Sequence, residues 1–220
     1  MSIKSSLENI TSSLPPHVTL VAVSKTWPVE DLMEAYEAGQ RIFGENKVQE
    51  MAEKFERMPM DIEWHMIGHV QTNKVKYMAP FVKLVHGVDS LKLLTEINRQ
   101  ALKNGRVIDC LLQMHIAEED TKFGLDEKEL QGIIASAEFK ELENIKVVGL
   151  MGMATFTEDE EQVRKEFIHL KTIFDTLAKQ PEIPNLKPET LSMGMSGDYK
   201  IAIECGATMV RIGSSIFGTR

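Results

Sequence analysis

The chain has 220 residues, of which 43% are hydrophobic, and it carries a formal net charge of −8. The apolar fraction is enough for a packed core, so the composition argues against a disordered chain. The acidic excess argues against nucleic acid as the main partner, and no run approaches the roughly 20 apolar residues of a membrane span. The polar N-terminal sequence lacks an apolar signal segment, which leads us to expect a cytoplasmic protein.

Apolar segments rich in β-branched residues recur along the chain and predict eight strands. They cover residues 18–24, 41–44, 62–68, 82–88, 107–115, 146–153, 189–193 and 208–212. Segments with helical spacing lie between them, such as the stripe formed by Val48, Met51, Ala52 and Phe55. Helices are expected over residues 3–14, 28–39, 45–58, 90–104, 126–138, 158–180 and 198–205.

Strands that alternate with helices predict βαβ units and a parallel sheet. Eight such units predict an α/β fold, a (β/α)₈ TIM barrel in which residues 1–220 form a single domain. An open, doubly wound sheet is the alternative. Its G-x-G-x-x-G fingerprint is absent after the first strand, where Ser24, Lys25 and Thr26 stand. In such a barrel the chemistry lies at the C-terminal ends of the strands.

Lys25 stands at the end of the first predicted strand, in the sequence V-A-V-S-K-T-W-P. A strand interior suits an ammonium poorly, whereas a desolvated pocket at the rim favours the neutral, nucleophilic amine. We therefore expect a buried amine that forms a Schiff base with an aldehyde. The alternative is a lysine whose amine simply reaches solvent.

Two segments near the C-terminus are candidates for binding an anion: S-M-G-M-S-G-D at 192–198 and R-I-G-S-S at 211–215. They follow the last two predicted strands, where barrels often bind phosphate. Glycines let backbone N–H groups approach an anion, and serines add hydroxyl donors. Ordinary turn chemistry is the alternative, and the Asp198 carboxylate would repel phosphate. Together with Lys25, these loops fit a ligand with an aldehyde and a phosphate, either pyridoxal 5′-phosphate or a sugar phosphate handled by an aldolase.

Arg211 bears on the choice of ligand, because it ends the last predicted strand and can point into the barrel. A guanidinium stays charged and only donates hydrogen bonds. Beside a pyridine nitrogen it would keep that nitrogen unprotonated and weaken the cofactor as an electron sink. Arg211 therefore favours holding a cofactor, or modest proton transfer. A surface ion pair is the alternative.

A metal site is not expected. His65 and His69 lie four residues apart, but the segment predicts a strand, in which four residues span roughly 13 Å, too far for one ion. Carboxylates that could serve as a base are Glu45, Glu118, Glu119 and Asp120, although such residues are more often solvated loop charges.

Six segments, in order and across nearly the whole chain, resemble a known family. They read A-V-S-K-T at 22–26, F-G-E-N-K-V-Q-E at 43–50, W-H-M-I-G-H-V-Q-T-N-K at 64–74, H-G-V-D-S at 86–90, L-S-M-G-M-S at 191–196 and M-V-R-I-G-S-S-I-F-G at 209–218. Together they resemble the pyridoxal phosphate homeostasis proteins, also called the YggS or proline synthase co-transcribed proteins.

The resemblance implies a barrel like the N-terminal domain of alanine racemase, with pyridoxal 5′-phosphate as its cofactor. Lys25 would hold the cofactor as an aldimine, Arg211 would face the pyridine nitrogen, and Asn46 would lie near the ring. The phosphate would be held by residues of the two C-terminal loops, namely Gly213, Ser214 and either Ser192 or Ser196.

The resemblance also implies a role in vitamin B6 balance and cofactor supply, with apo enzymes as possible recipients. The chain ends soon after the last predicted strand, so we expect no second domain to bring the tyrosine base of alanine racemases. Tyr36, Tyr77 and Tyr199 offer no clear replacement. We therefore expect a carrier, as a monomer or weak dimer, in which racemisation is slow or absent. A racemase and a Schiff-base aldolase are the alternatives.

Overall fold

The eight strands of the protein close into a parallel barrel in which neighbours along the chain are neighbours in space. The computed structural model describes residues 2–118, 123–180 and 182–219. Pairing of Leu20 with Val210 closes the barrel between the first and last strands. The predicted (β/α)₈ barrel is confirmed, and the open sheet is excluded. The strands are β1 Thr19–Val23, β2 Ile42–Glu45, β3 Glu63–Met66, β4 Leu84–Val88, β5 Ile108–Met114, β6 Ile145–Gly152, β7 Leu186–Ser192 and β8 Met209–Ile212.

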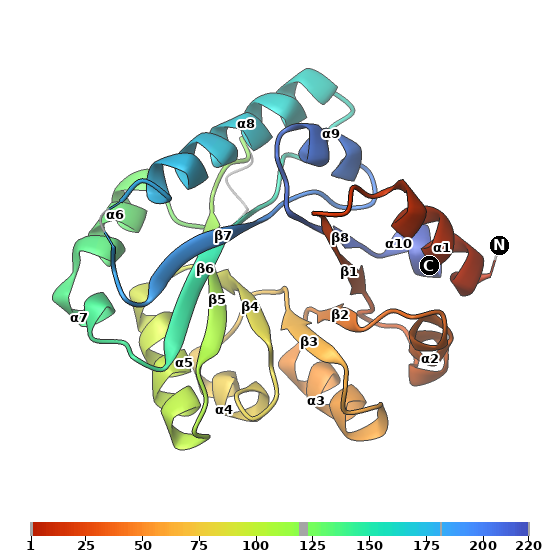
Figure 1. Ribbon diagram of the computed structural model, residues 1–220, viewed down its shortest axis with the longest axis horizontal. Coiled ribbons are helices and arrows are strands. Elements are labelled where there is room, and N and C mark those ends of the chain that lie inside the picture. The colour runs from red at the N-terminus through yellow and green to blue at the C-terminus, as the bar shows by residue number, and fades with distance from the viewer. Residues whose placement is uncertain (1, 119–122, 181, 220) are drawn as a thin grey trace.

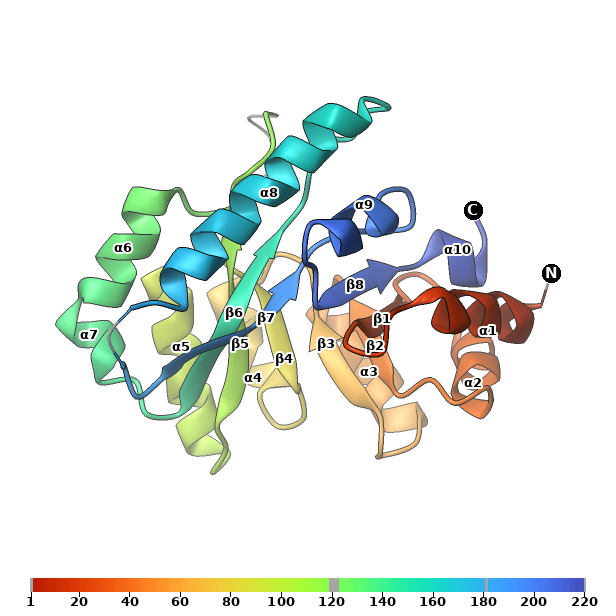
Figure 2. The ribbon, with the colours of Figure 1, turned by 45° about the horizontal axis from the view of Figure 1, so that its top comes forward.

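Helices surround the barrel and follow the strands in alternation (Figure 1). They are α1 Ile3–Ser13, α2 Val29–Glu37, α3 Val48–Arg57, α4 Val75–Met78, α5 Leu91–Lys103, α6 Glu127–Ala135, α7 Ala137–Lys140, α8 Glu160–Leu177, α9 Tyr199–Glu204 and α10 Ser214–Phe217, with a 3₁₀ helix, η1, at Thr72–Lys74. Figures 1 and 2 both show α1 and α10 side by side, so the two ends of the chain meet on one side of the barrel. No helix in the described ranges is long and apolar enough to cross a membrane.

Two predicted helices differ from the structure. The helix expected over 45–58 begins only at Val48, because Glu45 remains the last residue of β2. The helix expected over 126–138 is divided at Ser136, which ends α6 and whose hydroxyl accepts a hydrogen bond from the Phe139 N–H to cap α7. Serine competes for backbone hydrogen bonds in this way more readily than it continues a helix.

The barrel interior has an apolar layer formed by Val21, Leu84, Leu111, Met151 and Met209. These residues come from five strands that are not all adjacent, so their side chains meet inside the barrel. A larger cluster packs elsewhere, between the strands and the helices. Since side chains two residues apart point to the same face of a strand, the next inward positions lie one layer closer to the C-terminal mouth.

That next layer is largely polar, and it positions the candidate site. It comprises Val23, His86, Gln113, Met153 and Arg211, each two residues after a member of the apolar layer. The layer farther from the C-terminal mouth is thus apolar, and the polar side chains of the barrel interior lie in the layer just below the mouth.

Candidate functional site

A cavity of about 620 Å³ opens at the C-terminal ends of the strands. It is bounded by segments that follow β1, β2, β7 and β8, together with the residues after β3 and β6. Most of the residues predicted for the site share its wall: Lys25, Asn46, Ser196, Arg211, Gly213 and Ser214. A smaller hollow of about 410 Å³ lies along the outer face of α5 and contains none of them.

Lys25 lines this cavity, but its side chain is exposed. The prediction of a buried, desolvated amine is therefore wrong. Ser24 just before it is buried, so the chain leaves the barrel core abruptly between these two residues. Desolvation therefore does not make the Lys25 amine reactive. Any special reactivity has to come from the position and orientation of the amine at the cavity.

Behind the Lys25 turn lie three charged side chains, the buried Glu45 and Lys54 and the half-buried Glu50, here called the Lys54 cluster. The Lys54 ammonium donates to Glu45 Oε1 at 2.7 Å and to Glu50 Oε1 at 2.8 Å. Ser24 Oγ donates to Glu45 Oε1 at 2.6 Å. Burial raises the pKa of Glu45, an effect opposed by the charge of Lys54 and by these hydrogen bonds. Glu45 lies behind the cavity wall and not in it, so it is not placed to act as a base there.

Arg211 reaches the cavity from below, where its side chain is almost fully buried. Its Nη1 donates to Ser192 Oγ at 2.7 Å and its Nη2 donates to the Gly152 carbonyl at 3.1 Å. Burial lowers the pKa of Arg211 to about 10, with the nearby Asp198 carboxylate acting in the opposite direction. Arg211 therefore keeps its charge at neutral pH while being fixed from two sides.

Ser192 lies beneath Arg211 and is not among the residues of the cavity wall. Its hydroxyl is also 3.1 Å from Nδ1 of His86, whose Nε2 is 3.0 Å from Nδ1 of His65. Burial is the main cause that lowers the pKa of His65 to about 3 and the pKa of His86 well below its usual value. Both imidazoles are neutral at pH 7, and they form a buried chain of hydrogen bonds that ends at Arg211.

The two C-terminal loops converge at Ser196. Its Oγ accepts hydrogen bonds from the backbone N–H groups of Gly213 at 3.2 Å and of Ser215 at 3.5 Å. A Cβ at position 213 would lie 3.2 Å from both Cβ and O of Val23, so a larger residue would crowd β1. Asp198 Oδ1 accepts from the Met195 N–H within its own loop, at 2.6 Å. N–H groups that already converge on one oxygen are a suitable cradle for an anion.

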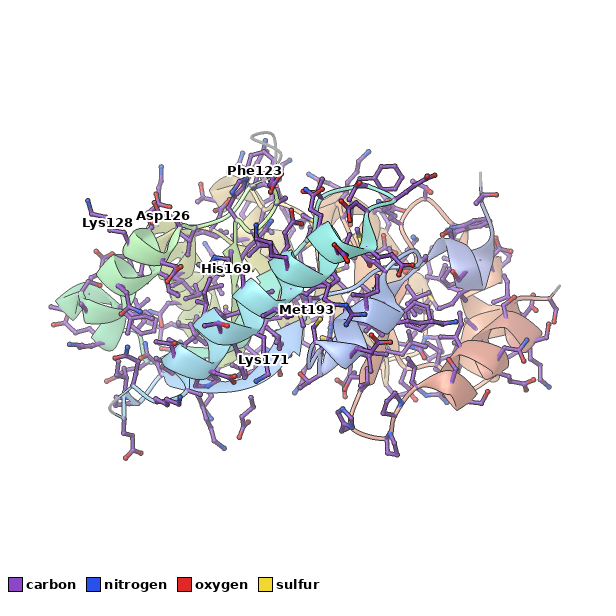
Figure 3. The ribbon with its side chains drawn as sticks, turned by 90° about the horizontal axis from the view of Figure 1, so that it is seen from above. Phe123, Asp126, Lys128, His169, Lys171 and Met193 are labelled. Atoms are coloured by element: carbon purple, nitrogen blue, oxygen red, sulfur yellow. The ribbon has the colours of Figure 1, made fainter. Side chains whose placement is uncertain are left out.

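The outer wall of the cavity carries apolar side chains, including Phe123, Phe156 and Met195, that are absent from the predicted site. His69 belongs to this wall; its Nδ1 is 3.2 Å from Asp89 Oδ2, and its ring stacks on Phe123 with 4.7 Å between centroids. Figure 3 shows Phe123 near the outer edge of the view, whereas Met193, labelled near its middle, is fully buried.

Of the predicted carboxylates, Glu118 is exposed and does not line the cavity, and Glu119 and Asp120 lie outside the described residues. No group of three or more His, Cys, Asp or Glu side chains within the described ranges is arranged to hold a metal ion.

Comparison with known proteins gives concordant matches. The family model described as "Alanine racemase, N-terminal domain" matches residues 2–220. The pyridoxal phosphate homeostasis protein of Aquifex aeolicus (strain VF5) is 42% identical over 202 residues, which cover 91% of this chain and 86% of that protein. The protein of the same name from Vibrio alginolyticus is 42% identical over 236 residues, covering 100% and 98%.

Solved structures agree with this result. The structure of PipY from Synechococcus elongatus PCC7942 with PLP bound matches with a TM-score of 0.89 and 35% identity, covering 98% of this chain and 100% of that one. An alanine racemase of Clostridium difficile 630 matches with a TM-score of 0.80 and 19% identity, over 100% of this chain and 56% of that one. The racemase match shows a shared fold.

Proposed function

This chain belongs to the family of pyridoxal phosphate homeostasis proteins, and we propose that it binds pyridoxal 5′-phosphate at the mouth of its barrel and takes part in the cell's balance of that cofactor. One observation carries the proposal. Lys25 lines the same cavity as Ser196, Gly213 and Ser214, the loop residues where backbone N–H groups converge. An aldehyde and a phosphate need these two kinds of partner, and a relative at 35% identity was solved with PLP bound.

Lys25 is the residue proposed to hold the cofactor covalently. Its amine condenses with the aldehyde, a C=N bond forms, and the aldehyde oxygen leaves as water. The exposed position of Lys25 supports a carrier role, because water or an incoming amine must reach the C=N bond to release the ligand. Covalent capture and reversible release are thus compatible at the same residue.

The other predicted residues divide the remaining contacts between them. Arg211 is proposed to face the pyridine nitrogen from the barrel floor, and Asn46 to lie near the ring. Ser196, Gly213 and Ser214 are proposed to hold the phosphate; Ser192 acts from beneath by fixing Arg211. A bound pyridoxal phosphate supplies an electron sink, but a guanidinium at its nitrogen weakens that sink. The position of Arg211 therefore supports a protein that binds the cofactor rather than one that racemises amino acids with it.

We take residues 1–220 as one cofactor-binding domain that works in the cytoplasm as a monomer or weak dimer. Pyridoxal phosphate released from the protein is proposed to supply apo enzymes. The racemase and aldolase alternatives have no specific contact in their favour among the described residues.

The experiment that tests the function is covalent trapping. Purified protein is incubated with pyridoxal 5′-phosphate, its visible absorption spectrum is recorded, and the adduct is reduced with borohydride and mapped by mass spectrometry. We expect a visible chromophore that reduction removes and a modified Lys25. Modification of Lys47 or Lys74 instead would refute the assignment of Lys25, and a protein that gains no chromophore would refute the function.

A further inference from the structure

The turn that carries Lys25 has an unfavourable backbone conformation. Thr26, the next residue, has a φ of +68°, and it is the only non-glycine residue with positive φ in the part of the chain that the structure describes. A β-branched residue adopts this left-handed region poorly, because its Cβ approaches the backbone. Such a turn persists only when surrounding contacts hold it.

The Lys54 cluster supplies those contacts on both sides of Lys25. The Lys54 ammonium donates to the Ser24 carbonyl at 2.8 Å, on the N-terminal side of Lys25. On the C-terminal side, the Thr26 N–H donates to Glu50 Oε1, which also accepts from Lys54. The two residues that flank Lys25 are therefore tied to a single ammonium and its carboxylate partner.

This arrangement is poorly explained by stability alone. The side chains of Lys54 and Glu45 are 7% and 0% exposed, and a buried ion pair is often no more stabilising than apolar residues of similar volume. Glu45 Oε2 is buried with no hydrogen-bond partner, which adds a desolvation cost. On the same helix, Arg57 forms an ordinary exposed pair with Glu30. Helix α3 thus carries one buried cation whose hydrogen bonds converge on the Lys25 turn.

We propose that the Lys54 cluster is a positioning device for Lys25, holding the Ser24–Thr26 backbone so that the amine is presented at the cavity mouth. The inference rests on the proposed function, because the amine needs a fixed approach only if it attacks an aldehyde. If this is so, changes in the Lys54 cluster should alter the rate and extent of C=N bond formation. They should leave the noncovalent affinity of the cavity for a ligand unchanged.

Two ligands separate these effects. Pyridoxal 5′-phosphate has the aldehyde, whereas pyridoxine 5′-phosphate has an alcohol in its place and forms no C=N bond. For Lys54→Met we expect the rate and extent of bond formation to fall by about tenfold. This is the factor by which the steric cost of one left-handed residue lowers the population of the turn once its supporting contacts are lost. The dissociation constant for pyridoxine 5′-phosphate should stay within about twofold. Arg57→Met, which removes an exposed cation from the same helix, should change neither.

Two further variants keep the test decisive if Lys54→Met folds poorly. Glu50→Gln is isosteric, and the Glu50 side chain is 22% exposed, so the variant should fold. It removes the charge that pairs with Lys54 but keeps an oxygen for the Thr26 N–H, so it should show the same selective loss to a smaller degree. Thr26→Gly should restore bond formation in the Lys54→Met or Glu50→Gln background, because glycine adopts positive φ without the steric penalty. Unchanged bond formation in both single variants, equal weakening of both ligands, or no rescue by glycine would overturn the inference. A wild-type protein that forms no bond at all would instead refute the proposed function.

Discussion

Arg211 is held by a hydroxyl that does not itself reach the cavity: its Nη1 lies 2.7 Å from Ser192 Oγ. Ser192 continues to His86 and His86 to His65, so four strands contribute to one buried polar chain below the mouth. The orientation of the guanidinium thus depends on residues beneath the ligand site. This relationship separates residues expected to touch a ligand from residues that support them.

Ser192→Ala should therefore act mainly on stability. The substitution removes an acceptor of Arg211 and leaves buried polar groups unpaired, so the free energy of unfolding should fall by about 1–3 kcal/mol. Urea denaturation measures this. The matched control is Ser214→Ala, at an exposed position, which should stay within about 0.5 kcal/mol of wild type. Equal effects of the two substitutions would contradict the supporting role of Ser192.

Lys25→Ala should abolish covalent capture while leaving the fold intact. The side chain is exposed, so the free energy of unfolding should change by no more than about 0.5 kcal/mol. Circular dichroism and borohydride trapping provide the two measurements. If the variant still yields a reduced adduct at full stoichiometry, another lysine holds the ligand.

Arg211→Ala combined with Ser214→Ala should weaken retention of pyridoxal 5′-phosphate. A hydrogen bond to a charged group contributes about 1.5–3 kcal/mol, so the cofactor should be lost faster on dialysis even with Lys25 present. Retention equal to that of wild type would argue against the proposed contacts. The single Ser214→Ala variant shows how much of the loss belongs to the phosphate cradle.

Stability should depend on pH through His65. Its pKa is about 3 in the folded protein against 6.5 ordinarily, so between these values the unfolded chain binds more protons. The free energy of unfolding should therefore decrease as pH falls from 6.5 towards 3, by about 1.4 kcal/mol per pH unit for one proton. Urea denaturation across this pH range measures the slope, and His65→Gln should reduce it by the contribution of one proton. A slope equal to that of wild type would contradict the assignment.

Most of the strands and the C-terminal loops were predictable because their signals are local, whereas β7 begins at Leu186, three residues before the predicted strand at 189–193. Parallel strands covered on both faces are apolar almost throughout, and β4 is buried at every residue. Dependence on local signals also explains which helices were missed or given the wrong first residue. The one-turn helices α4 and α10 are too short to show a period, and no local pattern distinguishes Glu45 as a strand end from Glu45 as a helix start.

Contacts across the barrel were not predictable in this way. His65, His86 and Ser192 lie on three strands, and their meeting depends on how the barrel closes. The exposure of Lys25 depends likewise on a turn held by a distant helix. One signal was available for His86: it stands two residues after Leu84, on a strand whose alternate positions point inward.

Closure between β1 and β8 has a consequence for synthesis of the protein. The first strand made is completed by the last, so β1 emerges from the ribosome with an open edge and keeps it until residues 209–212 follow. Open edges recruit other strands and favour aggregation. Chains that stop before β8 should accordingly depend on chaperones or be degraded, even though most of their residues are already made.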